Sequence, residues 1–479
     1  DGNDAVAAEL LMQRAAGERS PEKLRELFLR LGRIHIKRAP DPKRAVAAYA
    51  RVLQLDANNR EALDALSRLY TGLGENKSAS AITERLVRLE TAPDKRTVYH
   101  LRLGQLAERA SDLRAAGQHF RRAVEESPRD ATALGELVRF LDKIHDAAGR
   151  RQALDAAAAE LRNVVLAKPT DANAREGLAA VMRWRGRPAA AAAAQDLGAV
   201  LGLAGPSDGA TTARRLTALA NPEVDDRTFP AEVPTAVRTL FRILGPLDRQ
   251  NQKPDLARYR VDRSHRVAEG RTPRDAFEAI AADLGVGPFE LYVAPAADGN
   301  GSPLAMLPGR PPVVVLGTAL VKLGPDAVRF AAARALRLAA SHLEAALVGT
   351  PVDLAAWLVG VIRQFMPSYQ RAEVPPSLEA SVTARMARVV PRKSKQELTP
   401  FALEASGDLD VAAVWAGIRD GANRVGLLAS GRLDAALKVV FALAGQAITA
   451  EALTSNPEAR ALIKFALSDE YDDLARMLE

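Results

Sequence analysis

The sequence predicts a mostly helical protein: an α-solenoid of helix–turn–helix repeats, followed by an α+β domain with a small three-stranded sheet packed on helices. Three observations support this fold class. Residues 24–203 contain five self-similar segments roughly 35–41 residues apart, as expected of a repeat array. Strand-type patterns are confined to residues 289–316. From residue 326 onward the apolar residues recur with helical spacing.

The clearest repeat begins at Thr97. Its eighth and twentieth positions are the small residues Gly104 and Ala116, where the two helices of a unit come closest. Phe120 fills the space toward the next unit, and Pro128 ends the second helix. This spacing resembles that of tetratricopeptide repeats, which are helix–turn–helix units of about 34 residues. The resemblance implies a concave groove, lined by the first helix of each unit, that binds a peptide or a partner protein.

Four further units follow the pattern less closely. Their marker residues are Leu31, Gly32, Ala45 and Tyr49; Leu63, Leu66, Tyr70, Ala79 and Leu86; Leu134, Leu137, Leu141 and Pro169; and Ala174, Leu178, Val181, Ala190 and Leu197. Residues 1–20 are expected to form a helix of a preceding unit. The start at Asp1 instead of Met indicates a truncated or processed N-terminus.

The positions that line the groove in the resembled repeats are rich in basic side chains. The predicted partner-binding residues are Arg33, Lys37, Arg68, Gln105, Arg109, Arg139, Lys143, Arg175 and Arg183. Acidic residues at such positions are fewer, namely Glu26, Glu61, Asp64, Glu108 and Asp142. Because guanidinium groups bind carboxylates through paired hydrogen bonds, we predict that the groove binds an acidic peptide or partner protein. The alternative is that these arginines only solubilise exposed helices.

The net charge of +7 belongs to the first half of the chain. Residues 1–203 contain 34 Lys and Arg against 27 Asp and Glu, whereas residues 204–479 contain 32 of each. A basic surface also suits nucleic acid, but the excess is small and few aromatic residues are present to stack on bases. We therefore expect a protein partner and no nucleic acid.

The composition of the 479-residue chain, 48% hydrophobic and 26% charged, is that of a soluble globular protein with two or three domains. Its many Ala and Arg residues are typical of a high-GC bacterial genome. The absence of Cys excludes disulfides and leaves the compartment open, with the cytoplasm favoured. The most apolar stretch, residues 343–362, contains Glu344 and Asp353, so we expect no transmembrane segment. No cofactor is predicted, and the oligomeric state is unknown.

The array is expected to end at residue 203. Residues 204–235 contain several Pro and Gly residues, so we predict a linker there and a second domain over residues 236–479. The helices predicted at its start are 236–244, 255–269 and a third that opens at Thr272-Pro273 and ends at Leu284. The predicted strands are Phe289–Val293, Leu304–Leu307 and Val313–Leu316, separated by turns at 298–301 and 308–312.

The segment Arg329–His342 follows the third predicted strand, a short helix and a Gly-Pro-Asp turn. This order resembles the HExxH zinc endopeptidases of the CAAX prenyl protease class, over roughly residues 276–443. In that class the active helix carries His-Glu-x-x-His, and the resemblance places Arg334, Ala335 and Leu338 at these three positions. The third ligand, a Glu on a later helix, corresponds to Arg419. Arginine stays protonated and leucine has no donor atom, so these residues cannot bind zinc.

The resemblance therefore implies a peptidase fold that has lost its metal and its chemistry. We predict a non-catalytic protein–protein interaction scaffold with a repeat groove and a pseudopeptidase docking domain. One alternative is an atypical hydrolase with polar groups clustered around His342, Glu344 and Asp420. Another is a permanent structural subunit of a large assembly. The second domain is alternatively an ordinary helical domain with a small sheet.

Overall fold

The computed structural model describes residues 2–37, 41–205, 207, 214–249, 252–295, 303–347 and 349–478. Part of the predicted linker and the predicted turn at 298–301 lie outside the described residues. The chain divides into two compact units, Asp1–Leu161 and Arg162–Glu479. The predicted domain border at residue 203 differs from this division by one repeat. None of the helices in the described ranges is long and apolar enough to cross a membrane.

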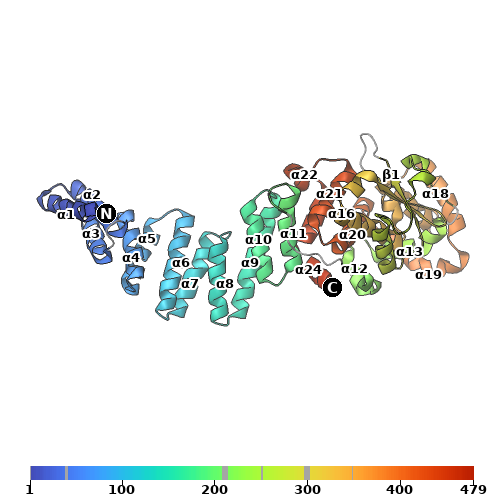
Figure 1. The fold of residues 1–479 in the computed structure, drawn as a ribbon. Coiled ribbons are helices and arrows are strands. Elements are labelled where there is room, and N and C mark those ends of the chain that lie inside the picture. The colour runs from blue at the N-terminus through green and yellow to red at the C-terminus, as the bar shows by residue number, and fades with distance from the viewer. Residues whose placement is uncertain are drawn as a thin grey trace. The chain divides into compact units, whose positions relative to one another are not determined.

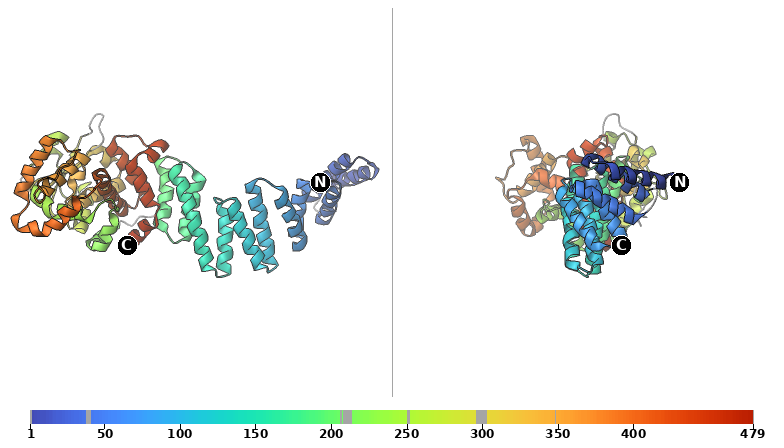
Figure 2. Two further views of the ribbon diagram at one scale, coloured as in Figure 1. Left: turned by 180° about the vertical axis from the view of Figure 1, so that it is seen from behind. Right: turned by 90° about the vertical axis from the view of Figure 1, so that its left-hand side faces the viewer.

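The first unit is a series of helical hairpins, seen from opposite sides in Figure 1 and Figure 2. Its helices are α1 (Gly2–Gly17), α2 (Pro21–Lys37), α3 (Pro42–Leu55), α4 (Arg60–Gly72), α5 (Asn76–Leu89), α6 (Pro93–Arg109), α7 (Leu113–Glu126), α8 (Ala131–Lys143) and α9 (Ala147–Ala167), which continues beyond Leu161. Helices α2 and α3, α4 and α5, and α6 and α7 pack together as pairs. The predicted helix–turn–helix array is confirmed.

Two glycines explain why the paired helices approach so closely. A Cβ atom on Gly32 of α2 would lie 2.5 Å from the ring of Tyr49 on α3. A Cβ atom on Gly104 of α6 would lie 2.7 Å from the ring of Phe120 on α7. Both rings are buried, so neither can move aside without opening the core. The eighth position of these two units is therefore small for the predicted steric reason.

The second unit contains the remaining helices and the sheet (Figure 1). Its helices are α10 (Ala172–Trp184), α11 (Pro188–Val200), α12 (Pro222–Thr228), α13 (Thr235–Arg249), α14 (Arg274–Leu284), α15 (Thr318–Lys322), α16 (Pro325–Ala340), α17 (Pro351–Ile362), α18 (Pro376–Val389), α19 (Lys395–Ala405), α20 (Val411–Ser430), α21 (Leu433–Ala444), α22 (Ala450–Ser455), α23 (Pro457–Ala466) and α24 (Asp469–Met477). Its 3-10 turns are η1 (Thr217–Ala220), η2 (Ala257–Tyr259), η3 (Arg263–His265), η4 (Glu344–Leu347) and η5 (Arg392–Ser394).

The sheet consists of the three predicted strands, β1 (Glu290–Ala294), β2 (Leu304–Leu307) and β3 (Val313–Gly317), in the order β1-β3-β2. Strand β3 runs parallel to β1 and antiparallel to β2. Every residue of β3 is buried, which explains its continuous apolar sequence. Beyond β3, the chain forms the short helix α15 and then α16, which packs along α20 in the core.

Two predictions for the start of the second domain differ from the structure. The helix predicted over residues 255–269 is wrong, because this segment forms only η2 and η3 and then runs beside β1. Arg266 forms a bridge with Tyr292, and the backbone N–H of Val267 donates to Leu291 at 2.8 Å. Residues 214–235, predicted as linker, pack into the unit instead, because their apolar side chains Leu216 and Phe229 are buried.

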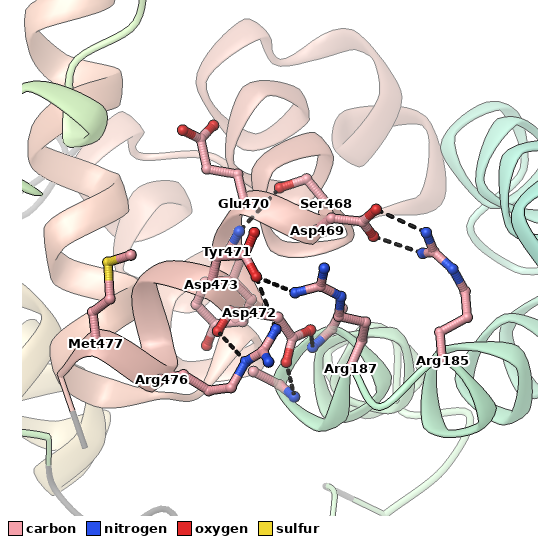
Figure 3. Close-up of polar contacts among 12 residues, drawn as sticks. Arg185, Arg187, Ser468, Asp469, Glu470, Tyr471, Asp472, Asp473, Arg476 and Met477 are labelled. Carbon is pink, nitrogen blue, oxygen red and sulfur yellow. Dashed lines mark hydrogen bonds and ion pairs between the residues drawn. The ribbon is translucent and has the colours of Figure 1, made fainter. Parts of the chain in front are cut away.

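The C-terminal helix α24 forms hydrogen bonds with the hairpin of α10 and α11, as Figure 3 shows. Asp472 accepts hydrogen bonds from the backbone N–H groups of Ala189 (3.0 Å) and Ala190 (2.9 Å), in the first turn of α11. Arg185 donates two hydrogen bonds to Asp469, at 2.6 and 2.8 Å. A carboxylate that binds free N–H groups at a helix N-terminus stabilises that helix. The fifth predicted repeat is therefore built into the second unit.

Candidate functional site

The predicted groove residues of the first unit lie on α2, α4, α6 and α8, the first helices of their hairpins. The exposed basic side chains Arg33, Arg68, Arg139 and Lys143 are each paired with a carboxylate. Some of these carboxylates belong to a neighbouring hairpin. These predicted groove positions therefore carry a series of ion pairs, and their positive charge is lower than the count of arginines indicates.

Three of these pairings connect successive hairpins. Arg33 on α2 donates two hydrogen bonds of 2.6 Å to Glu61 on α4. Arg139 and Lys143 on α8 both contact Glu108 on α6, with nitrogen–oxygen distances of 2.7 Å. Hydrogen bonds from Arg139, together with those from Lys143, lower the pKa of Glu108 to about 2. Glu108 therefore stays ionised at neutral pH, and together with Glu136, which lies 3.0 Å from Arg139, it balances both cations.

A hollow of about 560 Å³ opens beside α2 and α4. Its charged lining residues are Arg33, Lys37, Glu61, Asp64 and Arg68. The apolar side chains of Ile36 and Leu73 also line it and are 41% and 40% exposed. Within the described residues, Lys37 is exposed and has no acidic partner. The structure thus brings three predicted partner-binding residues together in one concave place, beside apolar surface.

The other predicted groove residues do not line this hollow. Gln105 and Arg109 are exposed on α6. Arg183 is exposed on α10, in the second unit. Arg175, also on α10, is only 6% exposed, and a Cβ on Gly198 would lie 2.4 Å from its Nη1 atom. The assignment of Arg175 to a partner-binding surface is therefore corrected, because its guanidinium group packs between α10 and α11.

In the second unit, Arg334 and Arg419, two of the residues that the sequence analysis compared with zinc ligands, contact a single carboxylate. Arg334 on α16 is buried, with 2% of its side chain exposed, and its Nη1 atom lies 2.6 Å from Glu458 Oε1. Arg419 on α20 donates to the other oxygen of Glu458 at 2.9 Å. Asn423 on α20 accepts a hydrogen bond from Arg334 and donates one to Glu458, each at 2.7 Å. We call Arg334, Arg419, Asn423 and Glu458 the arginine cluster.

The electrostatics of the arginine cluster favour an ionised carboxylate. Burial alone would raise the pKa of Glu458, but the charges of Arg334 and Arg419 outweigh it and lower the pKa. Ala335 and Leu338 are fully buried. Across the described ranges, no group of three or more His, Asp or Glu residues is arranged to hold a metal ion. The cluster itself presents two guanidinium groups, which repel a cation.

The alternative catalytic residues are not brought together. His342 and Glu344 line one cavity with Arg249, which donates to His342 Nδ1 at 2.8 Å and forms an ion pair with Glu344. Asp420 lines a different hollow, where Arg424 donates to it at 3.0 Å. Neither cavity therefore unites the three residues that the hydrolase alternative requires.

Glu458 is the functional candidate that the sequence analysis missed. It lies in the first turn of α23, after the N-cap residue Asn456, and in sequence it reads as an acidic helix start. Its partners Arg334 and Arg419 lie far away along the chain. Nothing local in the sequence distinguishes Glu458 from other acidic residues at helix N-termini.

No family model and no curated protein matches the chain. Similar solved structures include a MamA protein, 21% identical, which covers 36% of this chain and 92% of its own, with a TM-score of 0.26. YrrB, described as a TPR protein with an unusual peptide-binding site, is 19% identical over 36% of this chain and 82% of its own, with a TM-score of 0.24. A tetratricopeptide repeat protein from Parabacteroides merdae is 20% identical over 43% and 75%, with a TM-score of 0.28.

Proposed function

We propose that this protein is a non-catalytic interaction scaffold, and that the hollow beside α2 and α4 binds an acidic peptide segment of a partner protein. The observation that carries this proposal is the convergence of Arg33, Lys37 and Arg68 on one hollow of about 560 Å³. Concave surfaces with a few polar groups and exposed apolar side chains are where proteins bind peptides.

The ion pairs in the hollow are compatible with an acidic ligand. Arg33 uses its Nε and Nη2 groups for Glu61, so the N–H groups of Nη1 remain for a second carboxylate. The pairing also fixes the orientation of the guanidinium, which lowers the entropy that a ligand must overcome. Lys37 supplies a positive charge that no described carboxylate compensates. Apolar ligand side chains would contact Ile36 and Leu73.

For the second unit we propose a degenerate peptidase-like domain that serves in docking. The order of β3, α15, a turn and α16 is the order expected from the resemblance. Arg334 and Arg419, which stand at two of the ligand positions that the resemblance implies, share the carboxylate of Glu458. An arginine–carboxylate cluster that joins α16, α20 and α23 supplies the kind of cross-link that a bound metal would supply, without a reactive water.

Selection of peptides against the full-length chain tests the first part of the proposal. We expect a random display library to enrich sequences that combine Asp or Glu with apolar residues. The variant Lys37→Glu should bind these peptides roughly ten-fold more weakly, because a like charge replaces an attractive one. Arg30→Glu is the matched control, since Arg30 is exposed on the same helix and does not line the hollow. Peptides without acidic residues, or unchanged binding by Lys37→Glu, would refute the proposal.

A further inference from the structure

A second cavity, of about 320 Å³, lies within the second unit. It is bordered by α13, β2, α17, α18 and α20 and by the segment that follows α16. The aromatic side chains of Phe241, Trp357 and Trp415 form part of its lining. The rings of Phe241 and Trp357 are stacked with centroids 3.7 Å apart. This cavity has the size and the apolar walls of a small-molecule site.

The first group of polar side chains in the cavity is ordered by Arg249. Its guanidinium forms an ion pair with Glu344 and donates to Nδ1 of His342 at 2.8 Å. Because Nδ1 accepts, the proton of the neutral imidazole lies on Nε2. Burial and the charge of Arg249 both lower the pKa of His342, so the ring carries no charge at neutral pH.

The backbone of the cavity wall is strained at His342. His342 has a φ of 59°, in the left-handed region that non-glycine residues rarely adopt. Its Cβ approaches Gly245 of α13 so closely that a Cβ on Gly245 would lie only 2.8 Å away. Residues held in such conformations are concentrated at functional sites.

The second polar group is Asp248, whose side chain is only 8% exposed. Its Oδ2 atom accepts a hydrogen bond from the indole N–H of Trp357 at 3.2 Å. Its Oδ1 atom is buried and, among the described residues, accepts no hydrogen bond. Arg385 Nε lies 3.1 Å from Oδ1 as an ion pair, but without hydrogen-bond geometry. A buried carboxylate oxygen without a donor is costly, so this atom is suited to a ligand that supplies one.

The charges around the cavity favour a cation. Its lining contains three carboxylates, of Asp248, Glu344 and Asp353, against two guanidinium groups, of Arg249 and Arg385. With His342 neutral and all three carboxylates ionised, the balance is one negative charge. Burial raises the pKa of Asp248, and it raises the pKa of Glu344 to about 6. Aromatic faces attract cations as well. We infer that this cavity binds a small organic amine, with its ammonium group on Oδ1 of Asp248 and its apolar body against Trp357 and Trp415.

Calorimetric titration of the full-length chain with three probes of one shape tests this inference. The probes are phenethylamine, 3-phenylpropionate and 2-phenylethanol, which are cationic, anionic and neutral. We expect the amine to bind and the other two to bind at least roughly ten-fold more weakly, as loss of a charge-assisted hydrogen bond implies. Two of the three Trp residues of the chain line the cavity, so fluorescence should report the same event.

Variants separate binding from folding. Asp248→Asn keeps an oxygen acceptor for Trp357 but removes the negative charge. It should weaken binding of the amine roughly ten- to hundred-fold. Asp408→Asn, at an exposed position outside the cavity, is the matched control. If Asp248→Asn does not unfold cooperatively, Ala345→Phe replaces it, because Ala345 is an exposed lining residue and a larger side chain there narrows the cavity. Equal binding of all three probes, no binding of the amine, or unchanged affinity in these variants would overturn the inference.

Discussion

The two units use the same arginine–carboxylate chemistry in different surroundings. In the first unit, the side chains of Arg33 and Glu61 are 56% and 42% exposed, so water and salt screen their attraction. In the second unit, Arg334 is 2% exposed and its partner Glu458 is 21% exposed. A buried pair is costly to form and far more costly to break. The exposed pairs are therefore free to exchange partners, whereas the arginine cluster belongs to the core.

The largest effect is expected from breaking the arginine cluster. Glu458→Ala leaves the buried guanidinium of Arg334 with Asn423 but without a counter-charge. We predict a loss of about 3–5 kcal/mol in the free energy of unfolding of the second unit, as for other buried pairs that lose one partner. Urea unfolding followed by circular dichroism measures it.

The matched control is the double variant Arg334→Met with Glu458→Leu, which removes both charges of the buried pair and leaves only Arg419, whose side chain is 29% exposed. It should recover most of the lost stability, because apolar residues of similar size replace a buried pair at little cost. If Glu458→Ala alone is as stable as the original chain, the arginine cluster does not hold α16, α20 and α23 together.

A smaller effect is expected from a pair of histidines, the buried His100 and the half-buried His119, which contrasts with the exposed ion pairs of the first unit. The Nδ1 atoms of His100 on α6 and His119 on α7 lie 3.3 Å apart. Burial, followed by the proximity of His119, lowers the pKa of His100 to about 4. The unfolded chain binds this proton near pH 6.5, so stability is complete above that pH and falls by about 3 kcal/mol as the pH drops to 4.

Unfolding measured at several pH values between 7 and 4 tests this prediction. His100→Gln is the comparison, because glutamine does not titrate and its stability should change less over the same range. Identical pH dependence in both chains would show that the two histidines do not couple folding of the first unit to pH.

The smallest effect is expected from the exposed pair. Arg33→Gln should change the free energy of unfolding by less than about 1 kcal/mol, because exposed ion pairs contribute little. The same change removes a guanidinium from the hollow and should weaken the binding of an acidic peptide. Peptide titration beside thermal unfolding separates the two effects. A large loss of stability would show that the exposed Arg33–Glu61 pair stabilises the fold as the buried arginine cluster does. The proposed difference between the two units would then be wrong.

The elements of the fold were largely predictable from the sequence. The small residues Gly104 and Ala116 indicated where two helices meet, because steric contact of this kind is local and periodic. The three strands were recognisable since β3 is a continuous apolar run. The helix predicted over residues 255–269 failed because pairing of Arg266 with Tyr292, a tertiary contact, decides its conformation.

The candidate sites were less predictable, because charge pairing connects residues that are distant in sequence. Arg33 was recognisable as a groove position, but its neutralisation by Glu61 on the next hairpin was not. Arg334 was identified as a residue that cannot bind zinc, whereas its partner Glu458 had no local signal. Asp248 was not identified either. It is a candidate ligand-binding residue because its buried Oδ1 atom accepts no hydrogen bond from the described residues, and only the packed structure reveals this.

The metal content of the purified full-length chain, determined by mass spectrometry and paired with thermal unfolding in the presence and absence of a chelator, tests the central claim most directly. We predict no stoichiometric zinc and the same unfolding temperature with and without chelator, because Arg334 and Arg419 stand where the proposed resemblance to zinc endopeptidases would place ligands. Stoichiometric zinc with a chelator-sensitive unfolding temperature would contradict it.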